Sequence, residues 1–320
     1  MPNSKTKTLL TLFVLIGTII IILSIAQSFK GFNSSLEIDA SPVDTLYNIK
    51  SFRLPDSVTF SGEKMPLENF DTRESLEREI LTSAYRHSST ILIIKRANRY
   101  LPIIEKILEK NNIPDDFKYL AAAESEYSNM ISPKGATGFW QIMPATGREQ
   151  GMEINSIVDE RYNLEKSTQF ACEYFQKSYE KYGNWTLAAA SYNGGRFGID
   201  SQIAIQHQNN YYDLLLNEET ARYVFRAVAY KLVISDPQRY GLNIGKEDLY
   251  PELTYYEVKV DSAIADFSEF ADRYGTNYKL LKLLNPWLRK PYLTPKRNKN
   301  YIIKIPADGM RNTENTEILN

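Results

Sequence analysis

Glu124 is the residue of this sequence whose position most directly suggests chemistry. Pro114 predicts that a helix begins shortly before Glu124. Counting from Phe117, the residues Phe117, Leu120, Ala121 and Glu124 fall on one helix face, so an apolar stripe leads directly to a carboxylate. Burial raises the pKa of a carboxyl group, and a Glu protonated at neutral pH is what a general acid requires. The alternative is a solvated Glu at a frayed helix end.

Residues 134–143 form a glycine-rich and aromatic run that predicts a small hairpin rather than a helix. Such a hairpin would place Phe139, Gln141 and Met143 on one face, and an amide beside apolar surfaces suits an N-acetyl sugar. The alternative is a tight structural turn in which Trp140 fills the core. Neither the P-loop nor the Gly-x-Gly-x-x-Gly spacing is present, so a nucleotide site is not expected.

Two further helices are expected to complete the site. An alanine-rich helix runs from residue 185 to Tyr192 and stops at Asn193, followed by two glycines that tolerate positive φ. The hydroxyl of Tyr192, in the last turn, can face a cleft. A last long helix covers residues 218–234, and its first-turn acids Glu218 and Glu219 are explained at least in part by the helix dipole.

Composition excludes several classes of function. The net charge is −1 with a pI near 6.3, and no long basic run follows the first few residues, so nucleic-acid binding is not expected. Cys172 is the single cysteine, which excludes an intramolecular disulfide and a Cys-rich metal site, and a buried inert thiol is expected. His87 and His207 share no ligand spacing. No metal and no cofactor are therefore expected.

The N-terminus carries a membrane signal. Residues 1–8 include Lys5 and Lys7, and residues 9–26 are uncharged and about long enough to span a bilayer. The positive charges before the apolar segment predict that the N-terminus lies in the cytoplasm and that the rest of the chain lies on the other side of the membrane. Residues 9–26 would then be an uncleaved anchor. A cleavable signal peptide is the alternative, because small residues end at Ala26.

The rest of the chain divides into segments by its pattern. Residues 27–71 predict an extended linker, 72–113 a helical lead-in, and 114–245 the domain that carries the candidate site. Residues 252–306 predict a small β-α-α-β module, and 307–320 a polar tail without expected structure. The expected fold class is mainly α, within α+β, with a small β-hairpin in the larger domain.

Four motifs resemble those of the lytic murein transglycosylases of the goose-type-lysozyme-like kind, membrane-bound D type. They are the Glu-Ser pair at 124–125, the Gly-rich run at 135–144, the Ala-Ser-Tyr-Asn-Gly-Gly run at 190–195 and the Glu-Thr-Ala-Arg-Tyr-Val run at 219–224. The C-terminal module resembles a LysM repeat, with its Asn-Pro-x-Leu turn at 285–288. It lacks the usual Gly-Asp-Thr-Leu start. The resemblance implies a lysozyme-like helical catalytic domain.

The resemblance further implies cleavage of the β-1,4 bond between N-acetylmuramic acid and N-acetylglucosamine without water. Glu124 would protonate the glycosidic oxygen and then accept the proton of the C6 hydroxyl, which closes a 1,6-anhydro ring. Ser125 would orient Glu124. The other residues that it implies at the sugar subsites, near the scissile bond and at the cleft wall are Gln141, Met143, Tyr192, Asn193 and Glu219.

Two alternatives stay open at this point. A hydrolytic muramidase or chitinase would share Glu124 but needs a second acid to activate water, and none has an obvious claim. A non-catalytic scaffold that binds the cell wall is the other. The partners expected are peptidoglycan glycan strands and the membrane, with no protein partner indicated. The expected location is the bacterial cell envelope, anchored in the inner membrane with the catalytic domain in the periplasm, or secreted there after signal cleavage.

Overall fold

The computed structural model describes residues 51–296 and 299–312, and from Phe52 onward the chain forms one compact unit. Within those two ranges, no helix is both long enough and apolar enough to cross a bilayer. The predicted basic segment, the predicted membrane segment 9–26 and most of the predicted linker lie outside the described residues.

The described chain is mainly helical, which confirms the predicted fold class. Asn side chains cap several of the helices by accepting hydrogen bonds from backbone N–H groups of the first turn, as at Asn163, Asn184 and Asn217. The helices of the larger domain are α2 (Phe70–Tyr85), α3 (His87–Lys110), α4 (Lys118–Ser125), α5 (Pro144–Glu149), α6 (Leu164–Tyr182), α7 (Trp185–Gly194), α8 (Arg196–Gln206) and α9 (Glu218–Ser235).

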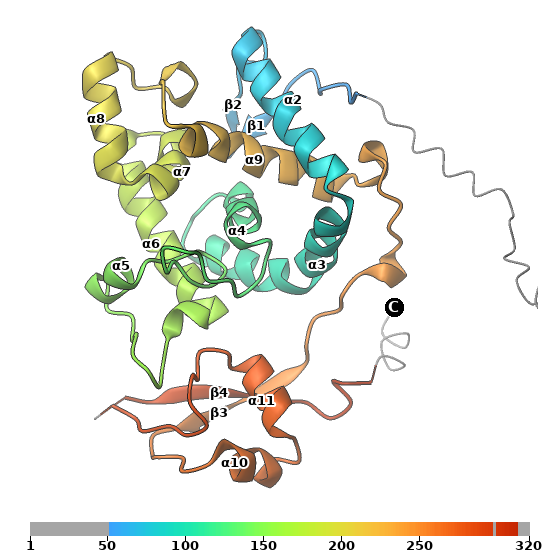
Figure 1. The fold of residues 1–320 in the computed structure, drawn as a ribbon, viewed down its shortest axis with the longest axis vertical. Helices are drawn as coiled ribbons and strands as arrows, with labels where there is room; N and C mark the ends of the chain where they lie inside the picture. Colours follow the sequence, from blue (N-terminus) through green and yellow to red (C-terminus); the bar gives the residue numbers. More distant parts are fainter. Residues whose placement is uncertain (1–50, 297–298, 313–320) are drawn as a thin grey trace, which may run out of the picture. The chain divides into compact units, whose positions relative to one another are not determined.

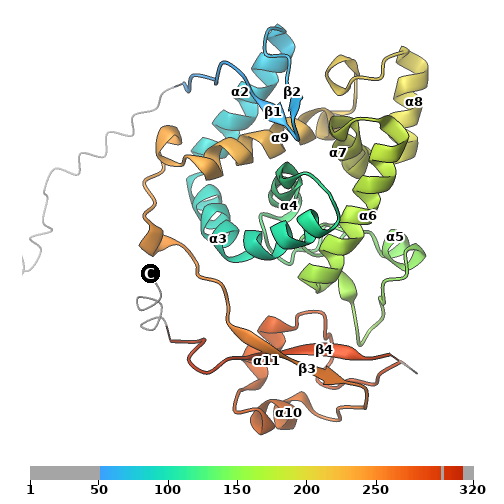
Figure 2. The ribbon, with the colours of Figure 1, turned by 180° about the vertical axis from the view of Figure 1, so that it is seen from behind.

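Helix α4 lies inside the larger domain. Figures 1 and 2 show it enclosed by α3, α6, α7 and α9. Phe117, Leu120, Ala121 and Ala122 are completely buried, because small side chains on α4 let the neighbouring helices approach closely. Cys172 on α6 is buried in the same core, as predicted, and burial raises the pKa of its thiol to about 12.

Residues 52–69 are not an extended linker, which corrects the sequence prediction. They contain the antiparallel hairpin β1 (Thr59–Phe60) and β2 (Glu63–Lys64). The Glu63 carboxylate accepts hydrogen bonds from the first backbone N–H groups of α7 at 2.5 and 2.9 Å, so this segment also caps a helix near the site. Its buried apolar residues are Phe52, Val58, Phe60, Met65 and Leu67.

The C-terminal module has the predicted β-α-α-β order. Its elements are β3 (Tyr255–Val260), α10 (Phe267–Arg273), α11 (Tyr278–Leu284) and β4 (Tyr301–Pro306), and β3 pairs antiparallel with β4 from Tyr255↔Pro306 to Val260↔Tyr301. Asn285 is completely buried and exchanges hydrogen bonds with the backbone of Lys304. The Asn-Pro turn after α11 is thereby fixed to β4. Residues 307–312 of the predicted tail form turns, and the rest lie outside the described residues.

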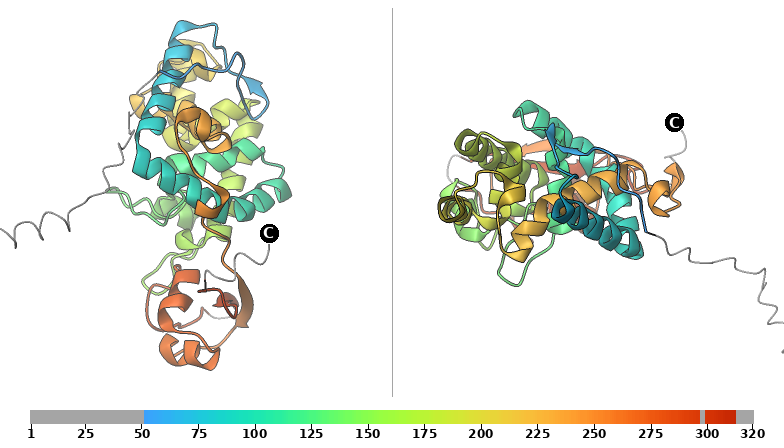
Figure 3. Two further views of the ribbon diagram at one scale, coloured as in Figure 1. Left: turned by 90° about the vertical axis from the view of Figure 1, so that its right-hand side faces the viewer. Right: turned by 90° about the horizontal axis from the view of Figure 1, so that it is seen from above.

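The segment between α9 and β3 passes across α3 (Figure 3, left). The backbone N–H of Tyr250 donates to the Lys95 carbonyl at 3.3 Å, and the side chains of Asn98 and Arg99 donate to the carbonyls of Tyr250 and Pro251 at 3.0 and 2.8 Å. The connection to the C-terminal module is therefore attached to the larger domain rather than free.

Candidate active site

Glu124 lies in the last turn of α4, half-buried at the wall of a cavity of about 290 Å³. One of its carboxyl oxygens, Oε1, accepts a hydrogen bond of 2.6 Å from the Tyr223 hydroxyl on α9. The cavity is lined from α2, the residue between α2 and α3, α4, α9 and the residues after α4: Thr82, Arg86, Ala123, Glu124, Ser125, Glu126, Met130, Arg222, Arg226 and Tyr230.

Burial raises the pKa of Glu124 to about 7. The nearby Glu219 carboxylate raises it further, while the hydrogen bond from Tyr223 and the positive charge of Arg226 lower it. A carboxyl group with a pKa near 7 carries its proton in a large fraction of molecules at neutral pH and can also give it up. The group is therefore suited to acid and base steps in turn.

The chain turns sharply directly after α4. Glu126 and Tyr127 have φ values of 53° and 52°, a left-handed conformation that is uncommon for residues other than glycine. The turn is held by an ion pair of 2.7 Å between Arg86 and the Glu126 carboxylate and by a hydrogen bond of 3.1 Å from Arg96 to the Glu126 carbonyl. Such strained residues concentrate at functional sites.

Ser125 is buried and does not contact Glu124 through its hydroxyl. Its Oγ lies 2.9 Å from the Phe139 carbonyl and 3.2 Å from the Ala121 carbonyl, and it accepts a hydrogen bond from the Ser128 backbone N–H. The resemblance implied that Ser125 orients Glu124. The observed bonds instead attach α4 to residues 135–143, which we call the site loop.

The site loop is a compact turn with two isolated β-bridges, Ile131↔Thr137 and Thr137↔Ile142, rather than a regular hairpin. The prediction that Phe139, Gln141 and Met143 share one face is wrong. Phe139 is buried, whereas Met143 is exposed, because Gln141 has a φ of 46° and interrupts the alternation of a strand. The Gln141 amide donates to the carbonyls of Gly138 and Met130 at 2.8 and 3.2 Å.

Trp140 fills the core, as the structural alternative for this run predicted. It is completely buried, and its indole N–H donates to the Thr168 hydroxyl at 2.9 Å. The Tyr192 hydroxyl donates to the Trp140 carbonyl at 2.6 Å. Tyr192 therefore fixes the site loop to α7, whereas the sequence interpretation directed its hydroxyl toward a cleft.

Asn193 and Glu219 lie together. The Asn193 amide donates to the Glu219 carboxylate at 3.3 Å and accepts a hydrogen bond of 2.8 Å from the Thr220 hydroxyl. Since Glu219 also raises the pKa of Glu124, the two carboxyl groups are close enough to interact electrostatically. Glu219 is exposed and is not among the residues that line the cavity beside Glu124.

The sequence pattern does not single out Tyr223, Arg222 or Arg226, although the first two lie in the motif at 219–224 and Arg226 lies two residues after it. Arg222 contacts the buried Glu79 carboxylate at 2.6 Å, and Arg226 contacts it at 3.4 Å. Helical spacing could have indicated Tyr223, because it follows Glu219 by one turn and therefore lies on the same face of α9. Across the described ranges, no group of three or more His, Cys, Asp and Glu could hold a metal ion.

Two domain families match the chain. Residues 102–215 match the transglycosylase SLT domain, and residues 256–309 match the soluble lytic transglycosylase C-terminal LysM-like domain. The first match covers α4, the site loop and α7, and it ends before α9, so the Tyr223 contact lies beyond it.

Relatives that match over a longer stretch agree with these two domain matches. Membrane-bound lytic murein transglycosylase D from Escherichia coli K12 and its counterpart from Escherichia coli O6:H1 are each 27% identical over 239 residues, which is 72% of this chain. The chain spans about half, 51%, of the length of these relatives. A solved structure, the 70 kDa soluble lytic transglycosylase Slt70 of Escherichia coli, aligns with a TM-score of 0.38 and 16% identity over 59% of this chain and 32% of that one. The chain is homologous to membrane-bound lytic murein transglycosylase D and carries an SLT domain followed by a LysM-like domain.

Proposed function

We propose that the chain is a peptidoglycan lytic transglycosylase in which Glu124 is the catalytic residue. The observation that carries the proposal is the Glu124 carboxyl at the wall of the cavity, with a pKa raised to about 7 and one hydrogen bond from Tyr223. The SLT domain match and the homology to membrane-bound lytic murein transglycosylase D support the substrate class.

Each step of the proposed reaction needs one protonation state of Glu124. The protonated carboxyl group donates its proton to the oxygen of the β-1,4 bond between N-acetylmuramic acid and N-acetylglucosamine, and that bond breaks. The resulting carboxylate accepts the proton of the muramic C6 hydroxyl as that oxygen bonds to C1 and forms the 1,6-anhydro ring. The proton count balances, and Glu124 ends protonated and ready for another cycle.

The other predicted residues have supporting places in this proposal. We propose that Gln141 and Met143 on the site loop, and Asn193 with its hydrogen-bonded partner Glu219, bind sugar hydroxyl and acetamido groups. Ser125 and Tyr192 hold the site loop by its backbone carbonyls. We further propose that the catalytic domain works on the periplasmic side of the cell envelope, with residues 9–26 as its membrane attachment.

Hydrolysis is the second candidate, and Glu219 is the observation that favours it. An exposed carboxylate that interacts with the Glu124 charge is the kind of group that activates water in an inverting glycosidase. The two reactions differ in product, because hydrolysis adds one water molecule at the reducing end and ring closure does not.

Mass spectrometry of digested sacculi tests the proposal. The wild-type chain is expected to release 1,6-anhydro muropeptides, and Glu124→Gln is expected to lower the rate by about 10³-fold, within the usual range for loss of a general acid. Glu109→Gln is the matched control, because it removes an exposed carboxylate of α3 that does not line the cavity. Hydrated products from the wild type would identify a muramidase, and unchanged sacculus binding without any product would identify a scaffold.

A further inference from the structure

Residues 153–162, which we call the strap segment, belong to the larger domain in sequence and contact the C-terminal domain in space. The backbone N–H of Asp159 donates to the Trp287 carbonyl at 2.9 Å, and that of Arg289 donates to the Ile157 carbonyl at 2.7 Å. Two residues of the larger domain are buried in the apolar core of the C-terminal domain: Val158 and Tyr162. The two domains therefore share part of one core.

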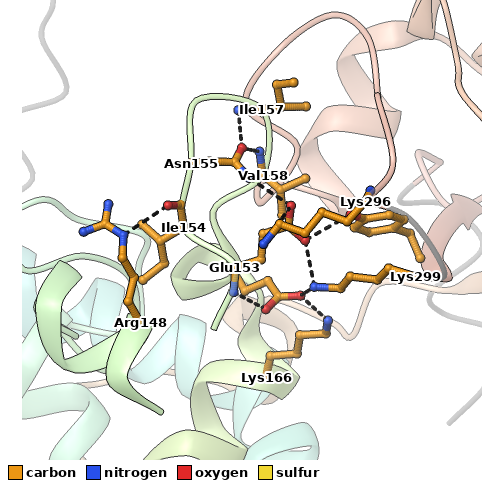
Figure 4. A network of polar contacts seen from close by, with 11 residues as sticks. Arg148, Glu153, Ile154, Asn155, Ile157, Val158, Lys166, Lys296 and Lys299 are labelled. Atoms are coloured by element: carbon orange, nitrogen blue, oxygen red, sulfur yellow. Dashed lines mark hydrogen bonds and ion pairs between the residues drawn. The ribbon is translucent and has the colours of Figure 1, made fainter. Parts of the chain in front are cut away.

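A buried ionic network reinforces this contact (Figure 4). Glu153 and Glu160 are 3% and 5% exposed, so their charges need partners. Lys299 of the C-terminal domain reaches both carboxylates at 2.7 Å, and the Tyr301 hydroxyl donates to Glu153 at 3.0 Å. Lys166 on α6 binds Glu160 from the other side. The acids of the strap segment are thus neutralised from two domains.

Arg161 connects the strap segment to the site loop. Its guanidinium forms a two-pronged pair with Asp159, at 2.9 and 2.7 Å. The remaining nitrogen, Nη1, donates to the carbonyls of Gly135 and Ile142 at 2.9 and 3.1 Å, which are at opposite ends of the turn in the site loop. A Cβ atom on Gly138 would lie 2.1 Å from the Arg161 carbonyl oxygen, so the loop rests directly on this residue.

The site loop has a backbone that needs such support. Gln141 has a φ of 46°, a strained backbone conformation that persists only where the surrounding structure imposes it. The loop carries the protected amides of Gly138, Gln141 and Ile142, which bond to carbonyls of the same turn or of Met130. These amides report directly on whether the turn keeps its shape.

We propose that the LysM-like domain is a positioning element for the active site, in addition to any role in binding glycan. It holds the strap segment, the strap segment fixes Arg161, and Arg161 fixes the site loop that carries Gln141 and Met143. The effect on catalysis rests on the function proposed above. The mechanical part, from Lys299 to the site loop, is independent of the substrate.

Hydrogen exchange measured by mass spectrometry tests the mechanical part on the full chain. Lys299→Met is expected to raise amide exchange at least about threefold in peptides covering 153–162 and also in those covering 135–143. Lys299→Arg, which keeps the charge, is expected to restore both. Lys279→Met is the matched control, because Lys279 is exposed on α11 of the same domain. Arg161→Lys is the second variant, and it should loosen 135–143 while β3 and β4 keep wild-type exchange.

The catalytic part uses a short soluble glycan fragment, which is too small to need the LysM-like domain for capture. Lys299→Met and Arg161→Lys are expected to lower kcat/KM by about tenfold with a rise in KM, because a loop displaced by a fraction of an ångström misplaces the sugar. The pH at which activity declines stays that of the wild type, since Glu124 and Tyr223 are on other elements.

Two results would overturn the proposal. One is faster exchange in 153–162 with wild-type exchange in 135–143, which would show that the strap segment moves without the site loop. The other is a kcat/KM for Lys299→Met on the short fragment equal to that of Lys279→Met. A wild-type chain that yields no product on any glycan would overturn the proposed function alone, because the exchange measurements would still decide whether the LysM-like domain holds the loop.

Discussion

Two regions of the molecule bury carboxyl groups and give them opposite protonation behaviour. At the cavity, burial raises the pKa of Glu124 to about 7, and its hydrogen-bond partner is the neutral Tyr223 hydroxyl. At the strap segment, burial also acts to raise the pKa of Glu160, but hydrogen bonds from Lys166 and Lys299 outweigh it and hold that pKa below its usual value. The partner therefore decides the charge, and a buried acid without a bonded cation is the one suited to proton transfer.

The largest expected effect is that of Glu124→Gln on the free energy of unfolding, measured by urea unfolding as a function of pH. The folded-state pKa of about 7 lies above the ordinary value of 4.5 for a Glu carboxyl, and this difference corresponds to about 3 kcal/mol. Both states are ionised above pH 7, where the folded state bears the full cost of burying the charge, and both are neutral well below pH 4.5. The variant is therefore expected to gain up to about 3 kcal/mol at pH 8 and little at pH 4. An equal gain at both pH values contradicts the assignment.

Glu160→Gln is expected to lower the stability of the fold at neutral pH, whereas Glu124→Gln raises it. A carboxylate with a lowered folded-state pKa contributes stability that is present above the unfolded pKa and is lost as the pH falls through the folded one. The free energy of unfolding of the variant should fall by about 1 to 3 kcal/mol near neutral pH. This loss is smaller than for a fully buried ion pair because both lysines are partly exposed. The loss should shrink toward pH 4. Glu165→Gln, whose partner is Lys304, is a control that removes an acid on the same side of the domain contact.

Tyr223→Phe should move the pKa of Glu124 further from that of Glu160, because it removes the hydrogen bond that lowers the pKa of Glu124. The pKa then rises above about 7, so the general acid stays protonated to higher pH. The decline of kcat/KM on the alkaline side should move upward, with a loss of rate of severalfold at the optimum. The pH profile on a soluble glycan measures both, and a shift toward lower pH would be incompatible with the role given to Tyr223.

The smallest expected effect comes from Glu219→Gln. Removing a like charge lowers the pKa of Glu124, so the alkaline decline should move to lower pH, in the direction opposite to Tyr223→Phe. Glu218→Gln is the matched control in the same helical turn, since Glu218 pairs with Arg222. Loss of all activity with Glu219→Gln, together with hydrated products from the wild type, would favour hydrolysis instead.

The interior position of Glu124 could be predicted from sequence because a helix has a fixed period. Phe117, Leu120 and Ala121 repeat at that period, and the burial of their face followed without knowledge of any distant residue. The order of elements in the C-terminal module was readable for the same reason, since two alternating segments flank two short helical ones.

The site loop could not be predicted in detail because a single backbone angle controls it. Alternation would have placed Phe139 and Gln141 together, but Gln141 adopts a positive φ that no local pattern indicates. The Tyr223 contact was missed for a different reason, because it joins residues 99 positions apart in the chain. Residues 52–69 resemble a linker in sequence because their apolar residues are scattered, and only the folded core shows which space those residues fill.

Val158 and Tyr162 lie in the core of the C-terminal domain, and this limits how freely the two domains can be exchanged in evolution. The two domain families match separate stretches, 102–215 and 256–309, which suggests modules that recombine freely at the connecting segment. A recombination in residues 216–255 would leave both side chains behind, so an incoming module must bring an apolar surface of matching shape and a cation for two buried acids. Descent is therefore expected to keep these two modules together, and co-variation between the strap segment and β4 should record that history.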